Sequence, residues 1–349
     1  MGIAQAAVVF LVAFAVSFAL TIVVRGTMRR LGVYDLPSGG RKAHTQPVAY
    51  EGGVAMHLAF VAGLIAAALA VPEFVFLRHE MQGILIGATL ATCVGVADDL
   101  LDLRPVAKLV AQAALGALMF YYGYRIERLT NPFGPEVIPA WWLSLAGTML
   151  WYALLMNGIN MIDGMDGLAA GIVAISGLTL AAIGADLGQP LAVALALITV
   201  AVCLGFLPFN FPPASIFMGD AGSLLLGFLL ASVSLLSSTK TPALLALLIP
   251  VMAVGLPLFE TVFAFARRAA KGQHPFRGDS RHLHHRFLNL GFSPRRTVFI
   301  FYYFSLLLGV TAFVLQRLEP VATMALVAAL STGLLVLLES LRFLEKRRP

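Results

Sequence analysis

The sequence predicts an all-α, polytopic integral membrane protein with about eleven transmembrane helices. Of its 349 residues, 59% are hydrophobic and only 12% are charged, whereas charged residues make up about 25% of a soluble domain. Apolar stretches recur along the whole chain, each near the roughly 20 residues that a helix needs to cross a bilayer. We therefore expect residues 1–349 to form a single transmembrane domain.

Eleven segments qualify as membrane spans by length and composition. They are residues 3–24, 49–70, 81–97, 105–123, 140–156, 168–185, 190–208, 221–238, 243–266, 297–316 and 320–341. No basic stretch precedes the first segment and no cleavage site of small residues follows it, so we interpret it as a retained span and not a signal peptide. Pro250 and Pro257 are expected to kink the ninth span.

The distribution of the basic residues predicts how these spans are oriented in the membrane. Of the 24 Lys and Arg residues, 19 lie in or beside loops 25–48, 98–104 and 267–296 and in the C-terminal tail. By the positive-inside rule these segments are cytoplasmic, with the N-terminus outside and the C-terminus in the cytoplasm. The net charge of +6 then reflects membrane topology, and we expect no nucleic-acid partner.

Acidic side chains gather on the same side, in loops far apart in the sequence. They are Asp98, Asp99, Asp102, Asp163, Asp166, Asp220 and Asp279. Carboxylates beside a membrane are unfavourable unless they bind something. Oxygen ligands favour a hard cation such as Mg²⁺, with Mn²⁺ as an alternative.

The stretch NGINMIDGMDG at 157–167 organises this side. Asn160, Asp163 and Asp166 recur every third residue, which on a helix would keep them within one third of the circumference. The alternative is a polar loop in which the three glycines make turns.

The stretch GVADDLLDLR ends the third span. On a helix Asp98 and Asp102 would share a face, with Asp99 beside them. The alternative is a solvated helix end paired with Arg104. Lys108, at the mouth of the next span, either extends its ammonium to the membrane surface or holds a phosphate as a point charge.

The stretch FNFPPASIFMGDAGS at 209–223 leads into the eighth span. Asp220 is either the N-cap of that helix or a metal ligand at its N-terminus. Phe217 could stack on a base, and Asn210 is a further candidate for substrate binding.

The loop 267–296 is the most basic, and its RHLHHRF stretch could bind zinc or form a membrane-surface patch. Diphosphate binding fits better, because arginine and imidazole donors suit phosphate oxygens. With the first loop, the predicted phosphate-binding residues are Lys42, His44, Arg281, His282, His284 and His285. Carboxylates around Mg²⁺ and surrounded by cations are what phosphoryl transfer requires, and a site at the membrane edge indicates a lipid phosphate.

Four motifs carry a resemblance to a known family. In order they are GVADDLLDLRP, NGINMIDGMDGLAAG, FNFPPASIFMGDAGSLLLGF and RHLHHRFLNLGFSPRRTV. Together they resemble the polyprenyl-phosphate N-acetylhexosamine-1-phosphate transferases of glycosyltransferase family 4, which are related to the phospho-MurNAc-pentapeptide transferase of peptidoglycan synthesis. The resemblance implies eleven spans, a cytoplasmic Mg²⁺ site, and transfer of a sugar 1-phosphate from a UDP-sugar to undecaprenyl phosphate with release of UMP.

The resemblance also implies roles for matching residues. Asp98 and Asp99 would be catalytic and would position or deprotonate the lipid phosphate. Asn160 and Asp220 would hold the Mg²⁺ ion. Lys108 would bind phosphate, and the RHLHH loop would clamp the diphosphate and the sugar.

On the nucleotide side, Asp166 and Phe217 would contact the uracil, with Asp163 supporting the site. The His-Leu-His-His form points to UDP-N-acetylglucosamine, although another UDP-N-acetylhexosamine or UDP-MurNAc-pentapeptide stays open. Glu51 and Glu260 depart from the family pattern, which weakens any role for their segments.

Two other functions would use the same acids. An aspartate-rich intramembrane prenyltransferase would use DDLLD but leaves FMGDAGS and the histidine loop unexplained. An ion-coupled transporter would need polar residues near the bilayer midplane, whereas here they stop at one face. Direct attack by the lipid phosphate is favoured over a covalent aspartyl intermediate, and a homodimer is compatible with the sequence.

Overall fold

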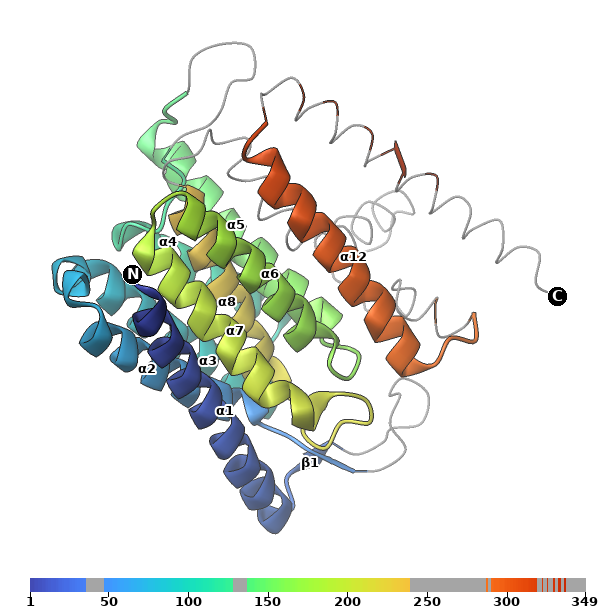
Figure 1. Ribbon diagram of the computed structural model, residues 1–349. Helices are drawn as coiled ribbons and strands as arrows, with labels where there is room; N and C mark the ends of the chain where they lie inside the picture. The colour runs from blue at the N-terminus through green and yellow to red at the C-terminus, as the bar shows by residue number, and fades with distance from the viewer. Residues whose placement is uncertain are drawn as a thin grey trace.

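The computed structural model describes residues 1–35, 47–127, 137–238, 287 and 290–318, with six isolated positions between 322 and 336. In these residues long apolar helices pack side by side (Figure 1). They are α1 (Ile3–Leu31), α2 (Gly52–Ala70), α3 (Arg78–Leu101), α4 (Pro105–Tyr121), α5 (Trp141–Ile162), α6 (Leu168–Asp186), α7 (Pro190–Asn210), α8 (Gly219–Ser238) and α12 (Pro294–Leu315). A 3-10 helix, η1 (Pro72–Leu77), precedes α3, and β1 (Tyr34–Asp35) pairs antiparallel with β2 (Val48–Ala49).

The all-α, polytopic membrane fold is confirmed. In the described part of the chain, eight helical segments are long and apolar enough to span a membrane, and the 17-residue α4 is a shorter apolar helix. Nine of the predicted spans coincide with these helices to within seven residues at either end. The span at 243–266 with its two prolines, and nearly all of 320–341, fall outside the described ranges, so the count of eleven stays a prediction.

Several helices extend further than predicted into the loops that carry the acidic residues. α5 runs to Ile162 because Ile159 and Ile162 continue its buried apolar stripe. The predicted loop at 157–167 is therefore wrong in its first half. The helix ends at Ile162 with Asp163 as its C-cap, and Gly167 takes a left-handed conformation with φ of 73°. The shared helical face predicted for Asn160, Asp163 and Asp166 is thus also wrong, since only Asn160 is helical.

The central helix of the bundle is α8. It contacts α2, α3, α5, α6 and α7, and Figure 1 shows it behind α6 and α7. Polar side chains join it to α5, because Trp151 Nε1 donates to Ser234 Oγ at 3.0 Å and the hydroxyls of Tyr152 and Ser232 lie 2.8 Å apart. Hydrogen bonds of this kind and close packing hold helices together where the apolar solvent gives little hydrophobic drive.

The first turn of α8 fits between α2 and α3 because both present a glycine to it. A Cβ atom on Gly95 of α3 would lie 2.3 Å from the Cα of Ala221, and one on Gly53 of α2 would lie 2.2 Å from the nitrogen of Gly222. The segment before α8 is also bound to the start of α2. Phe217 N donates to Ala49 O, and Gly52 N donates to Phe217 O, both at 2.9 Å.

The close approach of α3 to α8 predicts that Gly95→Ala lowers the thermal unfolding midpoint in detergent. The added methyl would meet backbone atoms, and overpacking of this kind typically costs about 1–3 kcal/mol. Gly26→Ala in α1 is the matched control, because a Cβ there meets nothing within 4 Å. Equal midpoints for the two variants, measured by intrinsic fluorescence, would contradict this packing.

Candidate active site

The acidic end of α3 is buried against its neighbours. Asp98 is 8% exposed. Its Oδ1 accepts a hydrogen bond from Leu103 N at 3.0 Å, and its Oδ2 pairs with the ammonium of Lys108. Asp102 ends the helix in a left-handed conformation with φ of 49°. Asp98 is thus buried and paired with Lys108, so the alternative of a solvated helix end paired with Arg104 is wrong for this carboxylate.

Asp99 caps α8 from the neighbouring helix. Its Oδ1 accepts from Asp220 N at 2.9 Å, and its Oδ2 accepts from Ala221 N at 3.0 Å. A carboxylate is favourable there because the first N–H groups of a helix have no partner inside it and carry partial positive charge. The alternative that Asp220 is the N-cap is wrong, since the cap comes from α3.

Tyr50, just before α2, completes the surroundings of Asp99. Its hydroxyl donates to Asp99 Oδ1 at 3.0 Å. Burial and the negative charge of Asp99 raise the pKa of Tyr50 well above its ordinary value, so it remains a hydrogen-bond donor. Three elements, α2, α3 and α8, thus meet at this carboxylate.

Lys108, in the first turn of α4, joins polar side chains at the ends of three other helices. Its ammonium contacts Asp98 Oδ2, lies 2.6 Å from Asp220 Oδ2, and lies 3.3 Å from Asn160 Oδ1. An ammonium has three N–H donors, so these oxygens account for all of them. The side chain is 14% exposed.

Asn160 and Asp220, the predicted metal ligands, lie side by side. Asn160 Nδ2 donates to Asp220 Oδ1 at 2.5 Å and to Ser223 Oγ at 2.9 Å. The amide oxygen of Asn160 therefore faces Lys108. The structure brings together residues 60 positions apart, as the metal-site prediction requires.

The predicted uracil-binding segments are joined to each other. Asp166 Oδ2 accepts from Ala214 N at 2.8 Å. Asn210 Oδ1 accepts from Gly167 N, and its Nδ2 donates to Ile216 O, both at 3.0 Å. Asn210 is 2% exposed and binds backbone at both ends of its amide, so it holds the turn at 163–167 against the loop at 211–217.

Helix α12 supports this pair of segments from the side. The hydroxyl of Tyr302 donates to Gly167 O at 2.5 Å, and Arg295 Nε donates to Pro212 O at 2.8 Å. Sequence reasoning missed Tyr302, Arg295 and Tyr50 as site residues. Tyr302 stands in an aromatic, apolar span, where nothing local marks a polar contact to a residue 135 positions away.

Asp163 follows α5 directly, and its side chain is partly exposed. Desolvation and the carboxylates of Asp220, Asp99 and Asp166 raise its pKa well above the ordinary value. A cation nearby would reverse this effect by favouring the ionised form. The side chain of Phe217 is also partly exposed, and its role beside a base stays a prediction.

The donor set fits a hard divalent cation. In the described ranges, no group of three or more His, Cys, Asp or Glu side chains is arranged to hold a metal. Two carboxylates and an amide oxygen nevertheless converge on the ammonium of Lys108. Mg²⁺ is commonly held by one or two carboxylates together with water and substrate phosphates, so this composition is compatible with it.

Known proteins resemble the chain over most of its length. The family model for glycosyl transferase family 4 matches residues 81–238. A probable undecaprenyl-phosphate N-acetylglucosaminyl 1-phosphate transferase of Bacillus subtilis (strain 168) is 34% identical over 88% of this chain and 84% of its own.

The chain belongs to glycosyltransferase family 4.

Two other relatives in this family carry related names. A decaprenyl-phosphate N-acetylglucosaminephosphotransferase of Mycolicibacterium smegmatis is 32% identical over 88% of this chain and 81% of its own. An undecaprenyl-phosphate alpha-N-acetylglucosaminyl 1-phosphate transferase of Escherichia coli (strain K12) is 27% identical over 78% of this chain and 73% of its own. The matched range 81–238 spans α3 to α8 and so includes three of the four predicted motifs.

The remaining predicted site residues lie outside the described part of the chain. They are Lys42, His44, Arg281, His282, His284 and His285. Glu260 lies outside it as well. Their roles in binding phosphate and sugar stay predictions of the family resemblance.

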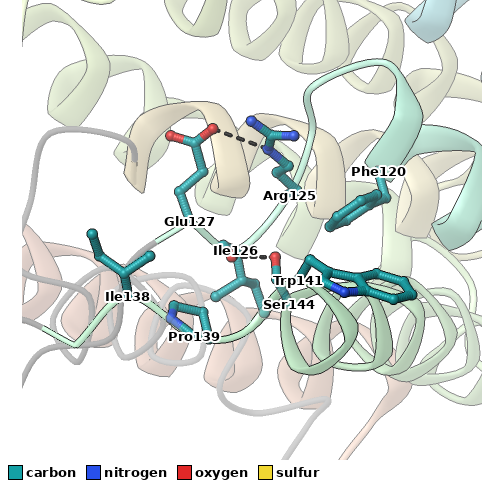
Figure 2. Close-up of a pocket in the computed structure, with 8 residues that line it drawn as sticks. All are labelled: Phe120, Arg125, Ile126, Glu127, Ile138, Pro139, Trp141 and Ser144. Atoms are coloured by element: carbon teal, nitrogen blue, oxygen red, sulfur yellow. Dashed lines mark hydrogen bonds and ion pairs between the residues drawn. The ribbon is translucent and has the colours of Figure 1, made fainter.

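A separate pocket of about 360 Å³ lies at the other end of α4 (Figure 2). Lys108 and Phe120 stand about 18 Å apart along this helix at 1.5 Å per residue, so the pocket is distinct from the acidic site. The charges of Arg125 and Glu127 pair at 3.1 Å. The residues that line the pocket are Phe120, Arg125, Ile126, Glu127, Ile138, Pro139, Trp141 and Ser144.

Glu51 departs from the family pattern. Its burial leads us to expect that the stability of the fold depends on pH. Its Oε2 is buried without a hydrogen-bond partner in the structure as described, and burial with the nearby charge of Asp99 raises its pKa from 4.5 to about 7. The folded protein therefore binds this proton more tightly than the unfolded chain, and ionisation destabilises the fold as the pH rises from about 4.5 through about 7. Glu51→Gln should remove that loss.

We expect the unfolding midpoint of Glu51→Gln, relative to the unmodified protein, to increase between pH 5 and pH 8. Glu73→Gln is the control, because Glu73 is an exposed acid on η1. Parallel pH profiles for Glu51→Gln and the unmodified protein would show that Glu51 is not desolvated.

Proposed function

We propose that the protein transfers N-acetylglucosamine 1-phosphate from UDP-N-acetylglucosamine to undecaprenyl phosphate, releasing UMP, at the cytoplasmic face of the bacterial inner membrane. The observation that carries the proposal is the convergence of Asp98, Asn160 and Asp220 on Lys108 at one end of apolar helices. Oxygen ligands and a cation at a membrane edge suit transfer between a soluble diphosphate and a lipid phosphate. The family and the names of the relatives support the same reaction.

The proposed metal ligands are Asn160 Oδ1 and the carboxylate of Asp220. Bound Mg²⁺, or Mn²⁺ in its place, would neutralise the charge that develops on the diphosphate as UMP leaves. Lys108 would bind phosphate oxygens as a point charge. Arg281 and the histidines of the RHLHH loop would orient the diphosphate and the sugar.

The proposed reaction is a direct in-line displacement. An oxygen of undecaprenyl phosphate attacks the β-phosphorus of the UDP-sugar, and the bond from this phosphorus to the bridging oxygen breaks. UMP leaves with that oxygen and its electron pair. Asp98 and Asp99 are the proposed groups that orient or deprotonate the lipid phosphate; Asp98 is paired with Lys108, and Asp99 accepts hydrogen bonds from Tyr50 and the α8 backbone.

The uracil would lie beside the turn at 163–167 and the loop at 211–217. Asp166 and Phe217 are the proposed contacts, since both belong to segments fixed by Asn210. A rigid pair of segments would bind the base without a large loss of conformational entropy. We also propose that the N-terminus lies outside and the C-terminus in the cytoplasm, on the distribution of basic residues.

We expect the purified protein in detergent to release UMP only when undecaprenyl phosphate, Mg²⁺ and UDP-N-acetylglucosamine are all present. Asp220→Asn should lower the rate about 100-fold or more, because it removes charge from the metal site, and losses of that size follow removal of comparable groups. Chelation should abolish release, and added Mg²⁺ should restore it.

Asp186→Asn is the matched control, because Asp186 ends α6 and pairs with Arg317 of the segment after α12, 2.6 Å away. This variant should keep its rate. No UMP release with any UDP-N-acetylhexosamine would contradict the proposed function. A stoichiometric burst of UMP before lipid is added would replace direct displacement by a covalent aspartyl intermediate.

A further inference from the structure

We propose that Lys108 and the divalent metal are alternative occupants of the same oxygens, so that metal binding releases Lys108 toward the substrate diphosphate. The inference rests on the proposed function for the identity of the substrate. It concerns the order of events at the site, which follows from the hydrogen-bond partners of three side chains.

In the observed arrangement Lys108 has no donor left for a phosphate. Its three N–H donors are taken by Asp98, Asp220 and Asn160. A phosphate oxygen can bind this ammonium as a direct hydrogen-bond acceptor only after at least one of these contacts is broken.

The proposed metal would bind the same oxygen atoms that accept hydrogen bonds from the ammonium of Lys108. Asn160 donates through Nδ2 to Asp220 and Ser223, which leaves its Oδ1 as the metal-binding atom. That oxygen faces Lys108, as does Asp220 Oδ2. A divalent ion on these two oxygens and an ammonium at the same place would repel each other.

The ammonium of Lys108 can move while its backbone keeps its position in α4. Lys108 N is fixed in the first turn of α4 by a hydrogen bond to Arg104 O at 3.2 Å. The side chain carries its charge on a flexible stem of four carbons, and because 14% of it is exposed, it is not completely enclosed. In the absence of a metal, Lys108 compensates the two carboxylates; with the metal bound, that charge is available to the diphosphate.

The first test measures Mn²⁺ binding to the full chain in detergent, without substrates, by electron paramagnetic resonance. Lys108→Met removes the competing charge and keeps an unbranched side chain. We expect it to bind Mn²⁺ at least ten-fold more tightly than the unmodified protein. Arg125→Met, which removes a positive charge at the far end of α4, should leave the affinity unchanged. Equal or weaker binding by Lys108→Met would overturn the proposal.

The second test needs no variant and applies even if Lys108→Met fails to fold. Acetylation of the unmodified protein, followed by mass spectrometry, reports how available each lysine amine is. Adding Mn²⁺ should increase labelling of Lys108 at least three-fold relative to the other lysines of the chain. Unchanged or decreased labelling would show that Lys108 keeps its partners and would overturn the proposal.

Adding UDP with the Mn²⁺ should then protect Lys108 again, because the diphosphate takes up the released ammonium. Labelling that stays high with UDP would overturn the part of the proposal that directs Lys108 to the diphosphate. These readouts are independent of turnover. A protein that shows them but releases no UMP keeps this inference and loses the proposed function, whereas an active protein without them loses this inference alone.

Discussion

The contact on which the site depends is the capping of α8 by the carboxylate of Asp99. The cap joins α3 to the first turn of α8 through two backbone N–H groups, and Gly95 allows the two helices to approach closely enough for it to form. Because Asp220 lies in that first turn, the cap also sets the position of the predicted metal ligand. A single carboxylate thus contributes both to the packing of α3 against α8 and to the geometry of the acidic site.

Charge balance is the second constraint. Asp98, Asp99 and Asp220 are brought together at the end of an apolar bundle, where unpaired carboxylates are unfavourable. Lys108 compensates two of them and the α8 backbone compensates the third. Under the proposed exchange, a divalent cation that binds Asn160 and Asp220 would replace the ammonium of Lys108 there. The same oxygens would then bind Lys108 and stabilise the fold when no metal is bound, and would bind the metal during catalysis.

The lengths of the apolar segments predicted the fold class, and the family resemblance carried by the four motifs implied that Asp98, Asn160 and Asp220 belong to one site. The sequence did not predict the helix ends. Apolar residues carry α5 past Asn160, and the chain then turns at 163–167, so Asp163 and Asp166 lie outside the helix. Contacts such as that of Tyr302 with Gly167 join distant segments, and no local periodicity encodes them.

The most direct test of this account is a structure of the protein crystallised with Mn²⁺, with the ion located by its anomalous scattering. The account predicts one strong peak in contact with Asn160 Oδ1 and a carboxylate oxygen of Asp220, with the ammonium of Lys108 displaced from both. A peak away from these two residues, or one beside an ammonium that still contacts them, would contradict it.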